Sequence, residues 1–248
     1  MMMKRLENKI ALVTGGGRGM GANITKRLAA EGAAVVLTYS KSAEQSERIA
    51  AEINQAGGRA IAIKADSADP AELTNAVDKT ISAFGHIDII VNNAGIYVGK
   101  AFEEHTMEDY EQVMAVNVRA VYASALAAVK HIPDGGRIIT IGSNMADNAT
   151  GPHATLYAMS KSALSGFTKG LARDLGPRDI TVNLVQPGPI NTDMNPSDTE
   201  LADFLRSRMA LKDYGTGDDV AGLVAFLASD EGKYITGTAL TIDGGFNA

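Results

Sequence analysis

Cysteine is absent from the chain of 248 residues, and the four histidines lie far apart in the sequence. Without cysteine the protein has no disulfide framework, no thiolate metal site and no cysteine nucleophile. The histidines, at positions 86, 105, 131 and 153, form neither the H-x3-H nor the H-E-x-x-H spacing of a metal site. We therefore expect no metal centre, and we interpret each histidine as a structural or surface residue.

Long apolar runs and an excess of basic charge are absent as well. No run reaches the roughly 18 apolar residues of a membrane span, and the first ten residues, MMMKRLENKI, contain no apolar signal segment. The 23 basic and 29 acidic residues are interspersed and give a net charge of −6. Such a surface argues against nucleic-acid coating and against a polybasic membrane patch. We expect a cytoplasmic protein with neither nucleic acid nor membrane as a partner.

Short apolar runs rich in β-branched residues alternate along the chain with segments of helical period. The expected strands are Ile10–Thr14, Ala34–Thr38, Ala60–Lys64, Ile87–Val91, Arg137–Ile141, Thr181–Val185 and Ala239–Ile242. The expected helices are Gly21–Glu31, Ser42–Ala56, Pro70–Phe84, Met107–His131, Thr155–Leu175 and Asp218–Ser229. This alternation predicts an α/β fold, a Rossmann-type doubly wound parallel seven-stranded sheet flanked by helices on both faces. Because no linker or repeat interrupts it, we expect residues 1–248 to form a single dinucleotide-binding and catalytic domain.

The segment 187–217 breaks the alternation, because it is rich in proline and asparagine and only briefly helical. Long insertions beyond the carboxyl ends of strands in open α/β sheets are often functional. Apolar residues occur along it at Met194, Leu201, Phe204, Leu205 and Met209. We interpret the segment as a substrate lid, and a plain surface loop is the alternative.

Glycine is the one residue in excess, with 26 copies, and several of them follow the first strand in the motif TGGGRGMG. Residues without side chains let the backbone approach a pyrophosphate, and the N-terminus of the following helix attracts the phosphate charge. The strand–turn–helix context makes this motif typical of dinucleotide binding, and a merely tight turn is the alternative. The expected cofactor contacts in this turn are Thr14, Gly15, Gly17, Arg18, Gly19, Met20 and Gly21.

The end of the second strand predicts which nicotinamide cofactor binds. An acidic residue there would hydrogen-bond the ribose 2′-hydroxyl of NAD(H) and repel a 2′-phosphate. Tyr39 stands at that position, followed by Ser40 and Lys41, and Arg18 adds a second cation nearby. Two cations without a carboxylate suit a 2′-phosphate, so we predict NADP(H). Solvated surface charges are the alternative interpretation of Arg18 and Lys41.

The motif YAMSK places Tyr157 and Lys161 one helical turn apart, on one face. Lowering a phenol pKa from about 10 to about 7 takes roughly 4 kcal/mol, which we expect Lys161 and a positively charged nicotinamide ring to supply. Ser143 ends the strand RIITIGS, where its hydroxyl could bind a substrate carbonyl oxygen. Asn117 could hold a water that links the lysine to solvent. The fourth strand ends in NNAG, a turn that can lie along the cofactor.

These motifs together resemble the short-chain dehydrogenase/reductase family over essentially the whole chain. TGGGRGMG, Asp66 after the third strand, NNAG, Asn117 in VNVRA, Ser143, the YxxxK pair and the Pro187-Gly188 turn occur in family order. The resemblance implies a catalytic tetrad of Asn117, Ser143, Tyr157 and Lys161. In it the tyrosine is the general acid–base and the serine positions the carbonyl. The lysine binds the nicotinamide ribose and lowers the tyrosine pKa, and the asparagine completes a proton relay.

The resemblance also implies contacts outside the tetrad. Asp66 would contact adenine, and the other expected cofactor contacts are Ser67, Asn93, Ala94, Gly95, Tyr157, Lys161, Pro187, Gly188, Ile190 and Thr192. The expected substrate pocket consists of Ile96, Tyr97, Ser143, Asn144, Met145, Pro189, Met194, Phe204 and Leu205. The C-terminal TIDGGF resembles the family's last strand and subunit-contacting tail, which implies a homotetramer.

Within the family the chain is most similar to 3-oxoacyl-acyl-carrier-protein reductases and related carbonyl reductases. Those carrier-protein enzymes grip their acidic partner with two basic residues. Arg178 matches the second, but Asp134 stands near the position of the first. The loop 144–155 between the serine and the tyrosine is also one residue longer than expected. We therefore expect NADPH-dependent reduction of a free ketone to an alcohol, with the proton from Tyr157. A carrier-protein reductase of fatty-acid synthesis and a non-catalytic nucleotide-binding signalling protein are the alternatives.

Overall fold

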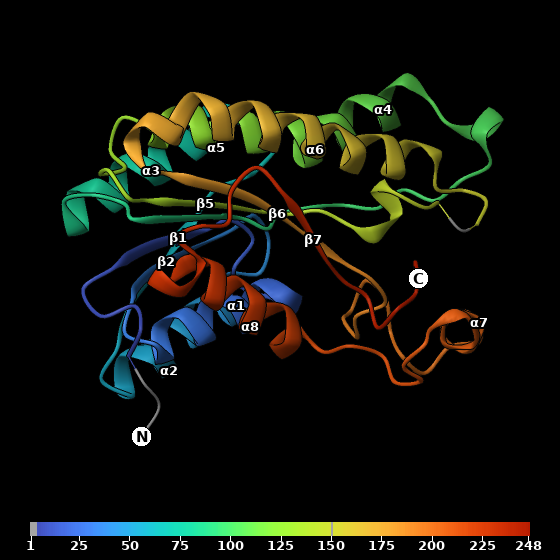
Figure 1. The fold of residues 1–248 in the computed structure, drawn as a ribbon, viewed down its shortest axis with the longest axis horizontal. Coiled ribbons are helices and arrows are strands. Elements are labelled where there is room, and N and C mark those ends of the chain that lie inside the picture. Colours follow the sequence, from blue (N-terminus) through green and yellow to red (C-terminus); the bar gives the residue numbers. More distant parts are fainter. Residues whose placement is uncertain (1–3, 150) are drawn as a thin grey trace.

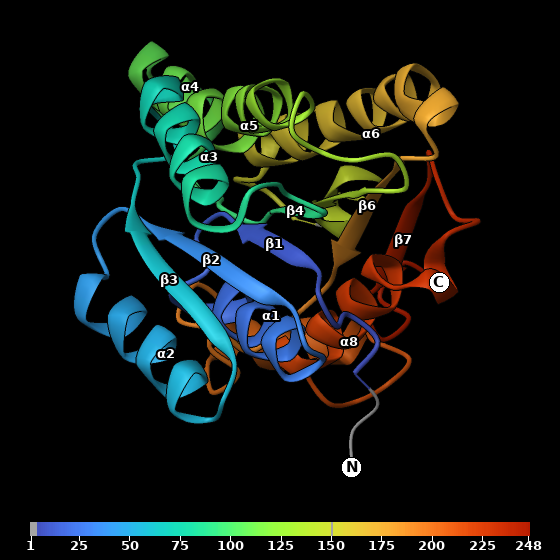
Figure 2. The same cartoon turned by 90° about the vertical axis from the view of Figure 1, so that its left-hand side faces the viewer.

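The computed structural model describes residues 4–149 and 151–248. Residues 1–3 of the expected domain, and Thr150 in the loop before Tyr157, lie outside the described residues. Seven parallel strands form one sheet in the order β3-β2-β1-β4-β5-β6-β7, and helices flank both faces (Figures 1 and 2). The strands are β1 (Ile10–Val13), β2 (Ala34–Tyr39), β3 (Arg59–Lys64), β4 (Ile89–Asn92), β5 (Arg137–Ile141), β6 (Thr181–Pro187) and β7 (Ala239–Ile242). The predicted fold class is confirmed.

Alternate residues of the strands enter two apolar layers. One layer packs under α1 (Gly19–Ala30), α2 (Ala43–Gln55) and α8 (Gly217–Ala228). The other lies under α3 (Pro70–Phe84), α5 (Ala120–Ala128) and α6 (Thr155–Leu175), with α4 (Met107–Met114) above the same face (Figure 1). The short helix α7 (Glu200–Arg208) stands apart from both layers. No helix in the described ranges is long and apolar enough to span a membrane.

Several expected elements differ from the structure at their ends, and at two of them a side chain makes a long-range contact next to the shifted end. The expected strand Ile87–Val91 begins at Ile89 instead, and directly before it the buried Asp88 binds Ile10 twice, with its N–H donating to Ile10 O at 2.9 Å and its carboxylate accepting the Ile10 N–H at 2.8 Å. The expected helix Met107–His131 contains a π-helical segment, Ala115–Arg119, between α4 and α5 and ends at Ala128. There the guanidinium of Arg178 donates to the free carbonyl oxygen of Val129 at 3.0 Å.

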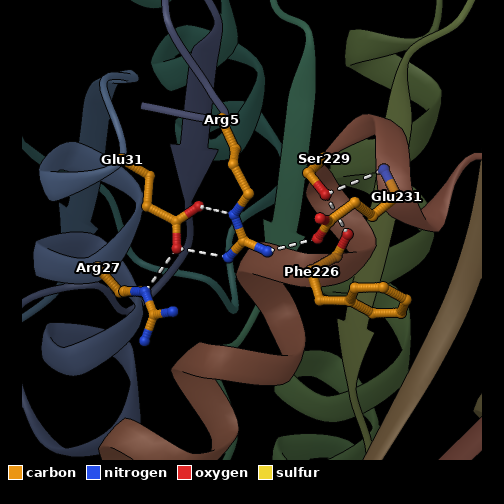
Figure 3. Close-up of polar contacts among 6 residues, drawn as sticks. All are labelled: Arg5, Arg27, Glu31, Phe226, Ser229 and Glu231. Carbon is orange, nitrogen blue, oxygen red and sulfur yellow. Dashed lines mark hydrogen bonds and ion pairs between the residues drawn. The ribbon is translucent and has the colours of Figure 1, made fainter. Parts of the chain in front are cut away.

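A buried ion-pair cluster joins the chain before β1 to the ends of two helices (Figure 3). The Glu31 side chain at the end of α1 is only 2% exposed and accepts from Arg5 at 2.7 Å and from Arg27 at 2.6 Å. Arg5 also donates to Glu231 at 2.7 Å, just after α8. Burial opposes the charge of Glu31, but the hydrogen bonds from both arginines outweigh it and lower its pKa. The cluster therefore fixes α1 relative to α8.

We expect Glu31→Gln to lower the free energy of unfolding by about 2 kcal/mol at pH 7, because the arginines lose their buried counter-charge. Urea unfolding measures this loss. Since the folded pKa is depressed, the contribution is present above the ordinary Glu pKa of 4.5 and is lost as the pH falls through the lowered value. Glu52→Gln, which breaks the exposed pair with Lys26, is the matched control and should cost much less, because solvent screens an exposed pair. Equal losses in both variants would contradict the expectation.

Candidate active site

A cleft of about 670 Å³ opens beyond the carboxyl ends of β1 to β4. It lies where the connections of the neighbouring strands β1 and β4 diverge to opposite faces, the usual ligand position in such sheets. The predicted residues that line it are Gly15, Arg18, Gly19, Met20, Gly21, Tyr39, Ser40, Lys41, Asp66, Ser67, Asn93, Ala94, Gly95, Ile96, Thr192 and Met194. The structure thus brings together residues from five separate parts of the chain that the sequence motifs singled out.

Seven further lining residues were missed by the sequence analysis: Thr38, Ser42, Ala65, Ala68, Gln112, Val116 and Asp193. Five of them adjoin predicted residues along the chain, so extending each strand end by one or two positions would have found them. Gln112 and Val116 lie on the helix that leads to Asn117, one turn apart. Only their spacing to Asn117 would have indicated them.

The glycine turn is locked to the end of β4. Thr14 Oγ1 accepts the N–H of Asn93 at 3.0 Å, and Asn93 Nδ2 donates to the carbonyl oxygens of Thr14 and Gly15, each at 3.0 Å. Gly15 and Gly19 have positive φ angles of 62° and 49°. A Cβ on Gly21 would lie only 2.2 Å from the Gly15 carbonyl oxygen. The turn therefore needs glycine at these positions for its own shape.

The N-terminus of α1 has donors to offer a phosphate. The helix begins at Gly19, and the residue before it, Arg18, provides no side-chain hydrogen bond to cap it. Uncapped N–H groups and the helix dipole together form an anion site. Arg18 and Lys41 are both exposed and line the same cleft, beside Tyr39 at the end of β2. The residues present therefore fit a dinucleotide with an additional phosphate.

Some predicted cofactor contacts do not line the cleft. Gly17 faces α2, because a Cβ there would lie 1.9 Å from Ser46 Oγ. This close packing accounts for glycine at position 17, and the expected contact of its backbone with the cofactor stays a prediction. Thr14, Pro187 and Ile190 are buried and lie outside the lining residues. Gly188 packs against Asp243.

Lys161 is almost fully buried and does not itself line the cleft, but it lies next to Gly95, which does. Its Nζ donates to the carbonyl oxygen of Ile141 at 2.9 Å and lies 5.7 Å from the centroid of the Tyr157 ring. A Cβ on Gly95, which lines the cleft, would be 3.3 Å from this Nζ. Burial lowers the pKa of Lys161 to about 8. The ammonium thus lies close to Gly95 at the edge of the cleft.

The environment of Tyr157 favours its neutral form. Burial raises the pKa of Tyr157 to about 12, the hydrogen bond with Ser143 acts in the opposite direction, and Tyr97 raises it further. The Tyr97 ring meets the Tyr157 ring edge-on at 5.1 Å between centroids, and its hydroxyl donates to the His153 carbonyl oxygen at 3.2 Å. The protein's own groups therefore raise the pKa of Tyr157, because burial dominates, and the lowering expected from Lys161 together with a nicotinamide ring stays a prediction. At neutral pH the phenol keeps a proton to donate.

Asn117 is fully buried in the π-helical segment and connects three elements. Its Oδ1 accepts the N–H of Ile96 at 2.9 Å, and its Nδ2 donates to Ile96 O and to Ser160 Oγ, each at 3.0 Å. Ser160 in turn donates to the carbonyl oxygen of Tyr157 at 2.7 Å. Both amide protons are committed, so the side chain fixes the loop after β4 and the helix of Tyr157. The expected relay water would find only the second lone pair of Oδ1.

The segment 187–217 is anchored at both ends. The N–H of Gly215 donates to Pro189 O at 3.0 Å, and Ile190 and Gly215 form an isolated bridge. Met209 is only 3% exposed, so it helps to hold the segment in place and is not part of a movable apolar face. Phe204 remains 51% exposed, and Leu205 lies beside it on α7; neither lines the cleft. Their contact with substrate stays a prediction.

The remaining pocket residues lie next to the tetrad. Asn144 is buried directly after Ser143, Met145 is half-buried, and Tyr97 is partly exposed above Tyr157. Pro189 is buried. Among the described residues, no three side chains of His, Cys, Asp or Glu gather as metal ligands do.

Comparison with known proteins identifies the family. A family model described as enoyl-(acyl carrier protein) reductase matches residues 15–247. The chain belongs to the short-chain dehydrogenase/reductase family. It is an NAD(P)-dependent oxidoreductase of this family that acts on CH–OH and C=O groups. The family predicted from the motifs is confirmed.

Three relatives are similar to this chain over nearly its whole length. A short-chain dehydrogenase from Burkholderia cenocepacia, solved in complex with NADP, is 56% identical with a TM-score of 0.97 and covers 98% of this chain and 100% of its own. An Escherichia coli cyclic-di-GMP-binding biofilm dispersal mediator protein is 43% identical over 247 residues, 99% of this chain and 100% of its own. A versicolorin reductase of Emericella nidulans is 39% identical over 254 residues, 97% of this chain and 96% of its own. The predicted cofactor, NADP(H), agrees with the molecule bound in the Burkholderia short-chain dehydrogenase.

Replacing Arg18 and Lys41, the two cations of the cleft, should weaken the binding of NADPH much more than that of NADH. We expect the double variant Arg18→Ala and Lys41→Ala to raise the Kd of NADPH by about 30-fold, because two charge-assisted contacts are lost. The Kd of NADH should change by less than about threefold, since it has no 2′-phosphate. Titration of coenzyme fluorescence measures both constants. Lys79→Ala, an exposed lysine on α3, is the control, and equal weakening of both coenzymes would refute the assignment.

Proposed function

We propose that this short-chain dehydrogenase/reductase is an NADPH-dependent carbonyl reductase that converts a small or medium ketone to an alcohol. The observation that carries the proposal is the grouping of Ser143, a protonated Tyr157 and a buried Lys161 next to Gly95, which lines the cleft. The 39% identity to a versicolorin reductase supports a carbonyl substrate. The roles of the four tetrad residues are part of this proposal.

The residues that line the cleft indicate where each part of NADP(H) would bind. The turn 14–21 and the N-terminus of α1 would bind the pyrophosphate, and Arg18 and Lys41 would bind the 2′-phosphate. Asp66 and Ser67 would contact the adenine end, and Gly95 with Lys161 the nicotinamide ribose. When bound, the cofactor supplies the hydride that reduces the carbonyl carbon.

The protein's own residues complete the reduction. Ser143 donates a hydrogen bond to the carbonyl oxygen and orients it beside the Tyr157 hydroxyl. Tyr157, neutral because burial raises its pKa to about 12, delivers its proton to that oxygen as negative charge develops there. Lys161 places a positive charge near the resulting phenolate and stabilises it. Asn117 holds the backbone of Ile96 and the helix of Tyr157 in place for this step.

A carrier-protein substrate is disfavoured by the surroundings of Arg178. Its guanidinium pairs with Asp134 at 3.0 Å and donates to Val129 O at 3.0 Å and to Ile132 O. The one matching basic residue is therefore engaged in holding the end of α5 next to an acidic side chain. An acidic partner protein would meet Asp134 there.

A nucleotide-binding signalling role is the second candidate. The observation in its favour is the 43% identity to a protein described as binding cyclic-di-GMP. The cleft that carries Arg18 and Lys41 offers two cations to any phosphate-containing dinucleotide. This role and catalysis would compete for the same cleft.

We expect Tyr157→Phe to lose at least about 1,000-fold in kcat, because the variant has no proton to donate. Its Kd for NADPH should stay within about twofold, since the phenyl ring keeps the packing with Tyr97. Stopped-flow NADPH oxidation and coenzyme fluorescence measure the two quantities. Retained turnover would contradict the role of Tyr157. Tyr110→Phe, on the exposed side of α4, is the control.

A substrate panel tests the function itself. With NADPH we expect aryl ketones and β-ketoesters to be reduced faster than 3-oxoacyl carrier-protein thioesters. Faster reduction of the thioesters would overturn the ranking. Absence of turnover with every ketone, together with binding of cyclic-di-GMP that NADPH displaces, would favour the signalling role.

A further inference from the structure

The C-terminal turn, residues 243–247, follows β7 and is folded tightly by the Asp243 carboxylate. The carboxylate accepts the N–H of Gly245 at 2.9 Å and that of Asn247 at 3.0 Å. Gly244 and Gly245 have φ angles of 63° and 75°, which other residues rarely adopt. Phe246 within the turn is buried. The end of the chain is thereby held in one conformation.

Asn247 connects this turn to the catalytic serine. Its Nδ2 donates to the carbonyl oxygen of Asn144 at 2.9 Å, and Asn144, only 4% exposed, is the residue directly after Ser143. Asn144 Nδ2 also lies 3.5 Å from Asp243 Oδ2. Ser143 Oγ accepts the N–H of Met145 at 3.2 Å and so caps the short turn Asn144–Ala146. Asn247 therefore holds the carbonyl at the start of the turn that Ser143 caps.

The same C-terminal turn carries the segment predicted to face the cofactor. The N–H of Gly188 donates to Ile242 O at 3.0 Å. A Cβ on Gly188 would lie 2.4 Å from Asp243 Cβ, so the Pro187-Gly188 turn rests directly on Asp243. Movement of Asp243 would move both the Ser143 side and the Gly188 side of the site.

The chain that follows α7 rests on the two glycines. The N–H of Leu211 donates to Gly244 O at 2.9 Å. A Cβ on Gly244 would lie 2.8 Å from Met209 Cε, and one on Gly245 would lie 2.6 Å from Ala210 Cβ. Three segments of the candidate site, at 143–146, 187–188 and 209–211, thus meet the last residues of the chain.

We propose that Asn247 is a positioning residue for Ser143, and that the C-terminal turn holds the serine in register with the Gly188 turn and the segment after α7. The serine hydroxyl must reach the carbonyl oxygen within hydrogen-bond distance, and a misplacement of about 1 Å can cost about 100-fold in rate. Removing the Asn247 amide leaves the buried Asn144 carbonyl oxygen without this donor. The kinetic consequence rests on the proposed reductase function.

Kinetics of Asn247→Ala test the proposal in the full-length protein. We expect kcat for ketone reduction to fall at least tenfold, with the Kd of NADPH within twofold and the unfolding midpoint within about 3 °C. Asn247→Asp keeps the size of the side chain but turns an oxygen toward Asn144 O, so its kcat should fall at least as far. Asn75→Ala, an exposed asparagine on α3, should leave kcat unchanged.

Hydrogen exchange provides a measurement that does not depend on turnover. With NADPH present, the amides of residues 145–149 should exchange at least fivefold faster in Asn247→Ala than in the wild type, and those of α3 should not change. If the wild type reduces no ketone, the reductase proposal fails and hydrogen exchange alone decides the positioning role. Unchanged exchange in both Asn247 variants overturns the proposal. A parallel loss of NADPH affinity and unfolding midpoint also overturns it, since Asn247 would then stabilise the whole fold.

Discussion

The cleft exists because the ends of β1 and β4 are hydrogen-bonded to each other through side chains. Asn93, directly after β4, donates through Nδ2 to the carbonyl oxygens of Thr14 and Gly15, and the Thr14 hydroxyl oxygen accepts the backbone N–H of Asn93. At this point the chain after β1 turns to one face of the sheet and the chain after β4 to the other. The side-chain bonds keep the two departing segments at a fixed separation. These bonds therefore set the position of the glycine turn relative to Gly95 and Lys161.

Burial determines the protonation states of Lys161 and Tyr157. It lowers the pKa of Lys161 to about 8 and raises that of Tyr157 to about 12, so both groups are driven toward their uncharged forms. The lysine remains largely protonated near pH 7 because its pKa of about 8 lies above that pH, and its ammonium donates to Ile141 O. The tyrosine keeps its proton until negative charge develops on a substrate oxygen. The site is therefore arranged as a donor for reduction.

The alternation of strands and helices was predictable because buried parallel strands are continuous apolar runs, and the glycine turn because its residues adjoin in sequence. The structure diverges where a single side chain acts over a long range. The Asp88 carboxylate binds the Ile10 N–H just before β4, and Arg178 binds the carbonyl oxygen of Val129 directly after α5. Neither contact produces a periodic pattern in the sequence from which it could be predicted. The bond between Asn247 and Asn144, across 103 residues, is invisible in the sequence for the same reason.

The environment of Tyr157 shows a different limit. A spacing of four residues correctly placed Tyr157 and Lys161 on one helix, but it does not tell which acceptor the ammonium chooses. That choice depends on Ile141 O, which comes from a strand 20 residues earlier. Short-range sequence patterns predict which residues form such a site. Their protonation states depend on packing against backbone groups that lie far away in the sequence.

The contact between Gly17 and Ser46 links the glycine turn to the neighbouring helix. A Cβ at position 17 would lie 1.9 Å from Ser46 Oγ and 3.0 Å from Ser46 Cβ, so a larger residue would displace the Ser46 hydroxyl, which donates to Ser42 O at 2.7 Å. Ser42 directly follows Lys41, so position 17 is coupled to the cation in the cleft although it does not line the cleft itself.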